Sequence, residues 1–343
     1  LTNPIRSEKR DPTMGCSTYS NDVHAARAAT RAATGTPAMK HDHDVRTGKA
    51  AAAVHPLLDI KGKDRESRDS DAHPRSKSIV VMFDHTGSMG DIPALLQAEL
   101  PKLMSLLVGK NYCEHPQVLF GCVGDAYDGS VAPLQVGQFE SGNEMDDAFA
   151  AMLLERLGGG TNQESYELAM YYFARHVKMD CLEKRGEKGY MFVIGDEAPY
   201  PHVDAATVRT IIGDSLEVDL PTSAVVAELR KKFDVFFLIP RGSSNFGDSK
   251  IRARWTDLLG EERVIDFDPR SACETIAATV GLMEGAIDAA GLRSDLADVG
   301  AAAATVASVT SGLAALAASA TAIAKVGTGD LPARRGPGAT VRL

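Results

Sequence analysis

The sequence has few cysteines and no pattern that would use them as a group. Its five cysteines are scattered over 343 residues and form no Cys-x-x-Cys pair, which argues for a reducing compartment and against a disulfide framework or a zinc ribbon. The first twenty residues hold no apolar segment typical of a signal peptide, so we expect a cytoplasmic protein. The sequence also lacks a Gly-x-Ser-x-Gly elbow, a Gly-x-x-x-x-Gly-Lys phosphate loop and a dinucleotide glycine fingerprint. The usual signals of hydrolases and nucleotide-binding enzymes are therefore missing.

Positive charge is scarce in the middle of the chain. Residues 78–290 carry 18 Lys and Arg against 33 Asp and Glu, a net charge of −15, whereas residues 1–77 carry +4 and residues 291–343 carry +2. An acidic body repels phosphate backbones, so we expect no nucleic-acid-binding core. The weakly basic N-terminal region could touch RNA or DNA, but segments of mixed charge are usually only solvated.

The same changes divide the chain into three regions: a polar and charged N-terminal arm (1–77), a domain (78–290) and an Ala-rich C-terminal region (291–343). The arm is low in hydrophobic residues, which favours disorder. Two stretches of the arm could nevertheless be ordered. Ala25–Ala33 fits a small helix, and the alternating charges of residues 65–71 fit a strap that crosses the domain.

The domain alternates short apolar runs with longer amphipathic segments, which predicts strands alternating with helices. We expect strands over Ile79–Phe83, Val118–Val123, Val131–Phe139, Tyr190–Ile194, Phe233–Ile239 and Val264–Phe267. Helices are expected over Ile92–Val108, Met145–Arg156, Gln163–Val177, Asp204–Ile212, Ser223–Lys232, Lys250–Leu259 and Ser271–Ala290. The predicted fold is α/β: a doubly wound, mainly parallel sheet with helices on both faces. The short Asp128-Gly129 link predicts one antiparallel edge strand.

The C-terminal region contains an uncharged stretch over Val299–Ala324 in which small residues dominate. Its length meets the criterion for a membrane span, but its hydrophobicity is poor. A packed or oligomerising helix is the favoured interpretation, because small residues permit close helix contacts. A membrane span and a mobile tail are the alternatives, and we expect disorder from Pro332 onwards.

Polar side chains follow two of the predicted strands. Asp84, Thr86 and Ser88 are spaced two apart directly after the first strand, so their oxygens can converge on one point. Asp196 follows the fourth strand, and Thr161 lies in a Gly-Gly-Gly-Thr-Asn loop before a helix. Because the carboxyl ends of parallel strands meet at one edge of a sheet, we expect these side chains to lie close together. Two carboxylates and three hydroxyls are hard oxygen ligands, suited to Mg²⁺, Mn²⁺ or Ca²⁺.

This arrangement resembles the metal-ion-dependent adhesion site (MIDAS) of von Willebrand factor A (vWA) domains. In that family Asp-x-Ser-x-Ser follows the first strand, a Thr lies in a later loop, and an Asp follows the fourth strand. Asp84, Ser88, Thr161 and Asp196 match these positions, and Thr86 replaces the usual Ser while keeping the hydroxyl. The resemblance covers residues 78–285 and implies a Rossmann-like vWA fold with one divalent cation, Mg²⁺ or else Mn²⁺ or Ca²⁺.

The resemblance implies a binding protein and not an enzyme. In the family the cation is incompletely coordinated by its own chain, so an Asp or Glu of a protein partner completes the shell. Bacterial intracellular members often act beside AAA-type ATPases or in multiprotein assemblies, which suggests such a partner here. One alternative is a structural protein that forms homo-oligomers through the arm and the Ala-rich tail. The other is a Mg²⁺-dependent phosphatase-like enzyme, disfavoured because Thr86 stands where that class needs a second Asp.

Each site residue also has a plainer interpretation. Asp84 could cap the turn that follows it, the glycines before Thr161 could be only a hinge, and Asp196 could be solvated. Asp125, after the second strand, fits a neighbour of the metal or a turn residue equally well. His85 is expected to point outward near the site.

Two other patterns draw attention. The run His41-Asp42-His43-Asp44, with His24 and His55 nearby in the sequence, is of a metal-binding composition. We expect this run to be solvent-exposed, since it lies in a polar arm. The loop over 199–202 is rigid in composition and is expected to lie beside the site, where it would shape partner specificity.

Overall fold

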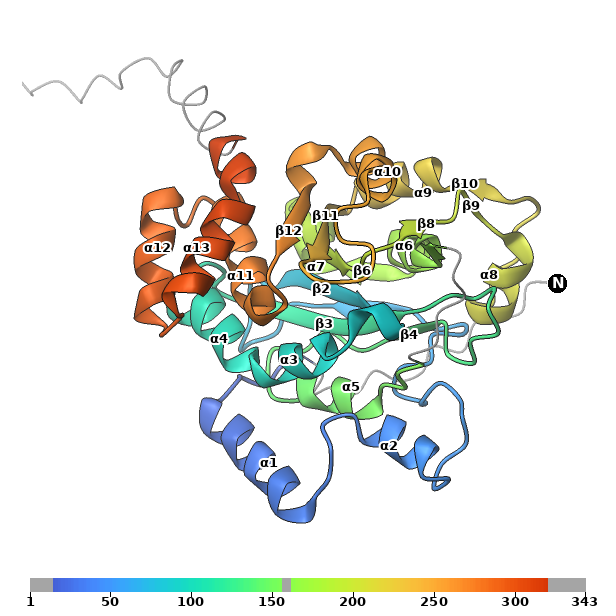
Figure 1. Cartoon of the computed structure of the whole chain (residues 1–343), viewed down its shortest axis with the longest axis horizontal. Helices are drawn as coiled ribbons and strands as arrows, with labels where there is room; N and C mark the ends of the chain where they lie inside the picture. Colours follow the sequence, from blue (N-terminus) through green and yellow to red (C-terminus); the bar gives the residue numbers. More distant parts are fainter. Residues whose placement is uncertain (1–14, 156–161, 320–343) are drawn as a thin grey trace, which may run out of the picture.

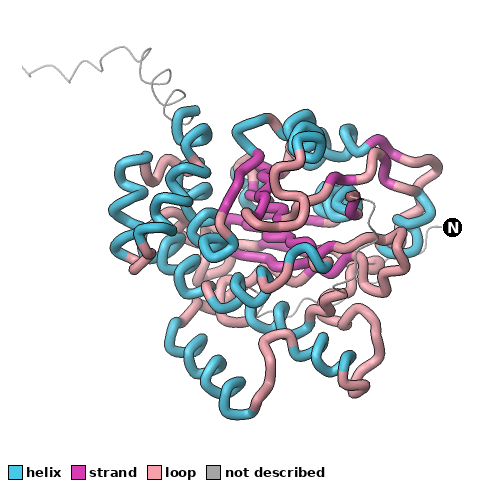
Figure 2. The backbone as a smooth tube through the Cα atoms, viewed as in Figure 1, coloured by secondary structure: helices cyan, strands magenta, loops and turns pink. Residues whose placement is uncertain are grey.

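The computed structural model describes residues 15–155 and 162–319 and places a six-stranded sheet at the centre of the molecule (Figures 1 and 2). The strand order is β12-β11-β7-β2-β3-β4. These strands are β2 (Lys77–Asp84), β3 (Pro116–Val123), β4 (Leu134–Val136), β7 (Gly189–Ile194), β11 (Phe233–Pro240) and β12 (Val264–Phe267). All neighbours pair in parallel except β3 and β4. The mainly parallel α/β sheet and its antiparallel edge strand are therefore confirmed.

Helices cover both faces of the sheet, and alternate residues of each strand face opposite layers. In β2, Ile79, Val81 and Phe83 belong to one core cluster, while Val80 and Met82 belong to the other. A strand buried on both faces needs a continuous apolar run.

The first cluster lies under α3 (Ile92–Ala98), α4 (Leu100–Met104), α5 (Met145–Ala151), α11 (Ala272–Met283), α12 (Ala289–Asp298) and α13 (Ala303–Gly312). The second cluster lies under α6 (Tyr166–Arg175), α7 (Asp180–Arg185), α8 (Ala205–Ile211), α9 (Thr222–Leu229) and α10 (Ser249–Leu259).

The helix predicted over residues 92–108 is broken into pieces. It consists of α3, α4 and a π-helical segment, η2 (Ser105–Gly109). Pro101 lies in the first turn of α4, where its missing N–H and fixed φ are tolerated but would interrupt a continuous helix. α3 and the Leu100–Gly109 helix meet at 54°.

The described part of the N-terminal arm is ordered, so the expected disorder is wrong for residues 15–77. The arm forms α1 (Asn21–Thr34), α2 (Lys40–Arg46) and β1 (Arg65–Ser67). Figure 1 shows α1 and α2 near α5, while β1 pairs in parallel with β6 (Val177–Met179). Arg65 is 2% exposed and donates to the carbonyls of Val136 and Gly137. The alternative prediction of a strap over residues 65–71 matches this arrangement.

The Ala-rich C-terminal region packs on the domain as far as Ala317. Val309 and Leu313 are buried in the first core cluster, and α13 lies beside α12 (Figure 1). This agrees with a packed helix; residues 320–324 of the predicted helix, and the tail beyond them, lie outside the described residues. Within the described ranges, no single helix is long and apolar enough to cross a membrane, although α3 and Leu100–Gly109 together pass as a bent pair.

The described residues also form three two-stranded pairings. Besides β1 with β6, β5 (Gln163–Glu164) pairs in parallel with β8 (Ala198–Pro199). β9 (His202–Val203) pairs antiparallel with β10 (Leu220–Pro221). The β5–β8 pair joins the chain just after Thr161 to the chain just after Asp196.

Candidate functional site

Asp84 ends β2, the strand that lies between β3 and β7, and its carboxylate is fully buried. One oxygen, Oδ1, accepts hydrogen bonds from the backbone N–H of Thr86 at 2.7 Å and from the Thr86 hydroxyl at 2.6 Å. The other oxygen, Oδ2, accepts from the hydroxyl of Tyr166 at 3.1 Å. Thr86 is itself only 5% exposed. Asp84 and Thr86 thus form one compact turn at the carboxyl edge of the sheet.

Asp196 reaches the same edge from the neighbouring strand. β2 and β7 pair in parallel up to Phe83 and Ile194, so Asp84 and Gly195 follow at equivalent positions. Asp196 is fully buried, and its Oδ2 accepts from the backbone N–H of Asn245 at 2.9 Å. The expected meeting of Asp84, Thr86 and Asp196 is therefore observed, and solvation of Asp196 is excluded.

The two remaining predicted ligands are Ser88 and Thr161, and the structure describes neither side chain. Ser88 lies in the short 3₁₀ turn η1 (Gly87–Met89), and its side chain is outside the described set. Thr161 also lies outside the described residues. Asn162, which follows it, has a left-handed φ of 55°, and its carbonyl accepts from the N–H of Ala198 at 3.2 Å. The chain that follows Thr161 is therefore attached two residues beyond Asp196.

Several acidic side chains crowd this edge. Burial, aided by the negative charge of Asp196, raises the pKa of Asp84 to about 7. Burial and the charges of Asp84 and Glu197 raise the pKa of Glu164 to about 10, and one of its buried oxygens, Oε2, has no described hydrogen-bond partner. Burial and the charges of Asp84 and Asp196 raise the pKa of Glu197 to about 7. Among the described Lys and Arg side chains, none forms an ion pair with Asp84, Asp125, Glu164 or Glu197. A cation would relieve the crowding.

Glu164 and Tyr166 are site residues that the sequence did not reveal. Tyr166 is fully buried at the start of α6, and in the sequence it looks like an ordinary core aromatic. Glu164 is the second residue of the helix predicted over Gln163–Val177, and an acidic residue in the first turn of a helix is commonplace. The only available signal was their closeness to the Gly-Gly-Gly-Thr-Asn loop.

Asp125 is a turn residue, and it also lies near the acidic side chains of this edge. Its Oδ1 accepts from the backbone N–H of Tyr127 at 2.9 Å, which stabilises a turn. Its Oδ2 accepts from the hydroxyl of Tyr200 at 2.9 Å, and its charge contributes to raising the pKa of Glu164 and of Glu197. Tyr200 belongs to the loop over 199–202, which therefore does lie beside the site.

His85 does not point outward, so that expectation is wrong. The ring is 2% exposed; its Nδ1 accepts from the N–H of Glu155 at 3.2 Å, and its Nε2 donates to the carbonyl of Ala132 at 3.3 Å. Burial lowers the pKa of His85, which favours the neutral ring that this bonding requires. His85 follows the last residue of β2, and the hydrogen bonds at both ring nitrogens hold the ring inside the protein.

The run over 41–44 is also less exposed than expected. It forms part of α2, and Asp42 is 5% exposed. Asp42 bonds to Arg46 and to the backbone of Leu154. His41 lies near His55, with ring centres 5.1 Å apart, and bonds to the carbonyl of Ala53.

The donor set fits a hard divalent cation. In residues 15–155 and 162–319, no group of three or more His, Cys, Asp and Glu side chains is arranged to hold a metal. A cation here would therefore depend on hydroxyl oxygens as well as on Asp84 and Asp196. The Thr86 hydroxyl donates its hydrogen to Asp84, and a hydroxyl oxygen is a hard donor of the kind that such cations take. Soft metals are disfavoured because neither Cys nor His belongs to the set.

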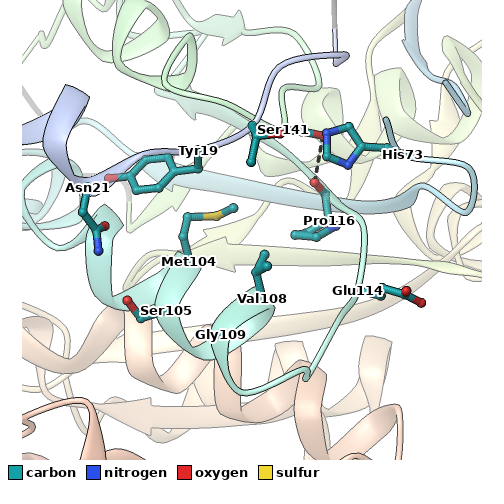
Figure 3. Close-up of a pocket in the computed structure, with 11 residues that line it drawn as sticks. Tyr19, Asn21, His73, Met104, Ser105, Val108, Gly109, Glu114, Pro116 and Ser141 are labelled. Atoms are coloured by element: carbon teal, nitrogen blue, oxygen red, sulfur yellow. Dashed lines mark hydrogen bonds between the residues drawn. The ribbon is translucent and has the colours of Figure 1, made fainter. Parts of the chain in front are cut away.

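Two surface hollows lined by described residues bear on the location of the site. One of about 260 Å³ is lined by Tyr19, His73, Met104 and Val108 (Figure 3) and also by Pro116, the first residue of β3. It therefore lies at the amino end of the parallel strands, opposite the carboxylate cluster. A second hollow of about 470 Å³ includes Ala126, the residue after Asp125, and so adjoins the cluster.

Comparison with known proteins gives only distant structural similarity. No protein-family model matches the sequence, and no curated protein matches it. The structure resembles the pilus adhesin SpaC from Lactobacillus rhamnosus GG in its open conformation, with 11% identity, a TM-score of 0.42, and 68% of this chain and 31% of that chain covered. It also resembles proximal thread matrix protein 1 from the mussel byssus, with 11% identity, a TM-score of 0.37, and 66% and 47% covered. The chain thus spans less than half the length of these structures.

Proposed function

We propose that the chain is a vWA-type, MIDAS-bearing module that holds one divalent cation, Mg²⁺ or else Mn²⁺ or Ca²⁺, and uses it to bind a carboxylate of a protein partner. Asp84, Thr86, Ser88, Thr161 and Asp196 would supply the ligands. The observation that carries this proposal is the buried Asp84 carboxylate, repelled by Asp196 and paired with no described Lys or Arg. A buried charge of this kind needs a partner.

The residues around the site support a binding role. With two carboxylates and neutral hydroxyls as donors, the cation would remain electrophilic and attract an Asp or Glu from outside. Asp84 and Thr86 would orient the cation, while Tyr166 holds the second Asp84 oxygen in place. Glu164 and Glu197 add negative charge around the ion, which strengthens cation binding.

We do not propose hydrolysis. A phosphatase of the alternative class needs a second Asp, which acts as an acid, two residues after the nucleophile. Thr86 stands at that position, and its hydroxyl is too weak an acid for that role. A cytoplasmic location, an AAA-type ATPase partner and homo-oligomerisation remain predictions.

The first test is cation affinity. We expect the protein to bind Mn²⁺, measured by loss of the free-ion signal in electron paramagnetic resonance, and Mg²⁺ to compete. Asp84→Asn should weaken Mn²⁺ binding by roughly a hundredfold, the upper end for loss of a metal-site group. The matched control is Asp91→Asn, an exposed Asp whose side chain caps no helix, which should leave affinity unchanged. Equal affinity for all three proteins would refute the site.

The second test is partner capture. Proteins retained by the wild type should be lost both with chelator and with Asp84→Ala, and the two lost sets should be the same. Asp91→Asn should retain them. Capture that survives chelator and Asp84→Ala would exclude the carboxylate-bridged mechanism while leaving the fold untouched.

A further inference from the structure

The arm helix α2 grips the backbone of one residue in the domain. Asp42 accepts from the N–H of Leu154 at 3.2 Å, and the guanidinium of Arg46 donates to the carbonyl of the same residue at 2.6 Å. Arg46 also donates to Asp42 through Nε at 2.9 Å, which holds the two side chains together. Both polar groups of Leu154 are thus satisfied by residues more than 100 positions earlier in the chain.

The segment that contains Leu154 is also hydrogen-bonded to a side chain of the domain. Gln135 in β4 makes the equivalent pair of bonds to Leu153, donating to its carbonyl at 2.8 Å and accepting from its N–H at 2.9 Å. Leu153 and Leu154 are therefore fixed by side chains from two sides, as a strand is fixed by its neighbours. Without α2, only the Gln135 side of this arrangement would remain.

The next residue connects this segment to the proposed cation site. The backbone N–H of Glu155 donates to Nδ1 of His85 at 3.2 Å. The Glu155 carboxylate accepts from the N–H groups of Val131 and Ala132, and the carbonyl of Ala132 accepts from Nε2 of His85. His85 is therefore held at both ring nitrogens by groups that depend on the position of Glu155.

His85 lies between Asp84 and Thr86 in the sequence, on the turn that presents both oxygens to the site. We propose that Asp42 and Arg46 are positioning residues for the cation site: by holding Leu154, they fix Glu155 against His85 and so fix the Asp84–Thr86 turn. This inference rests on the proposed function. It makes the arm a working part of the site and not only a packing element.

The test compares two arginines of the arm. Arg46→Ala removes the bond to the carbonyl of Leu154, whereas Arg27→Ala removes bonds from α1 to Asn143 and Asp147, for which no bond to the Leu153–Glu155 segment is described. We expect Arg46→Ala to weaken Mn²⁺ binding by roughly threefold to tenfold, at or below the low end for groups that orient metal ligands. Arg46→Lys should recover part of the loss, and Arg27→Ala should match the wild type.

A second readout does not depend on metal. The ¹⁵N resonances of the His85 ring report which nitrogen carries the proton and which accepts a bond. Arg46→Ala should shift the Nδ1 resonance, and Arg27→Ala should not. Asp42→Asn, which keeps an acceptor for Leu154 but loses the charge facing Arg46, provides an independent variant should Arg46→Ala fail to fold; we expect a smaller loss of the same kind.

The outcomes separate the two proposals. If the wild type binds Mn²⁺ and Arg46→Ala binds it as tightly as Arg27→Ala does, the positioning role is refuted and the cation site stands. If the wild type binds no Mn²⁺, the proposed function fails, and the His85 resonance still decides whether α2 is coupled to the Asp84–Thr86 turn. An unchanged His85 resonance in Arg46→Ala would overturn the coupling itself.

Discussion

Tyr166 reaches Asp84 because the residue facing its hydroxyl is a glycine. A Cβ placed on Gly195 would lie 2.0 Å from the Tyr166 hydroxyl oxygen and 2.7 Å from its ring carbon Cζ. Gly195 does not need a left-handed backbone here; it needs the absence of a side chain. The position before Asp196 is thus set by the aromatic ring that supports Asp84.

We therefore predict that Gly195→Ala destabilises the protein and disturbs the site. The added methyl must displace a ring that is fully buried, at a cost of about 1–3 kcal/mol in the free energy of unfolding. The matched control is Gly109→Ala, because a Cβ there meets no atom within 4 Å. Chemical denaturation measures both. A Gly195→Ala protein as stable as Gly109→Ala would show that Tyr166 moves freely and does not fix Asp84.

Some of the residues of the site could be predicted from the sequence, and others could not. Asp84, Thr86 and Asp196 could be predicted because each follows a buried strand at a recognisable spacing. Glu164 and Tyr166 could not, since their role depends on where α6 begins and not on any local pattern. His85 was misjudged because a polar residue beside a site suggests exposure, whereas its ring bonds to two backbone groups that come close only in the fold.

Among the elements, those with strong periodicity were predicted well and those set by tertiary contacts were not. β2, β3, β7, β11 and β12 follow their apolar runs closely. The arm was misjudged because its polar residues bond to distant parts of the chain: Arg65 bonds to β4 and its neighbours, and Asp69 bonds to α7. Composition alone cannot show that buried polar groups have partners.

Asp69 attaches the strap over residues 65–71 to α7 of the domain. Its carboxylate accepts from the N–H and hydroxyl of Ser76 and from Arg185 and Lys184 of α7. Burial alone would raise the pKa of Asp69, but hydrogen bonds from Arg185, Ser76 and Lys184 outweigh it and hold the pKa well below its ordinary value. The folded state therefore favours the ionised form.

We predict that Asp69→Asn lowers the free energy of unfolding by about 2 kcal/mol at pH 7, the size of a charge-assisted hydrogen bond. Because the pKa is lower in the folded state, this stabilisation is complete above the unfolded pKa of about 4, begins to fall below that value, and is lost as the pH falls through the lower folded-state pKa. The difference between wild type and Asp69→Asn should therefore shrink below about pH 4.5. Urea unfolding at several pH values measures it, with exposed Asp71→Asn as the control. A difference that is constant with pH would contradict this account.

For the whole molecule, the sheet brings together at one edge carboxylates that lie more than 100 residues apart, Asp84 and Asp196, in a body of net charge −15. Parallel strands impose this meeting, since every strand that runs the same way ends at the same edge. Both helical layers pack on the sheet, and their buried residues form the two core clusters. Because only the folded sheet brings Asp84 and Asp196 together, repulsion between their carboxylates destabilises the whole fold. A cation bound between them would stabilise the whole fold.

That linkage gives a prediction for the intact protein. A ligand that binds only the folded state at a hundred times its dissociation constant adds about 2.7 kcal/mol to stability, so saturating Mg²⁺ should raise the melting temperature by about 5 °C. Asp84→Asn should melt higher than the wild type in chelator, because it removes the repulsion with Asp196, and should gain nothing from Mg²⁺. Potassium chloride at equal ionic strength controls for screening of the acidic surface. If potassium chloride raised the wild-type melting temperature as much as Mg²⁺ does, the stabilisation would be general screening, and the buried carboxylates would need no cation of their own.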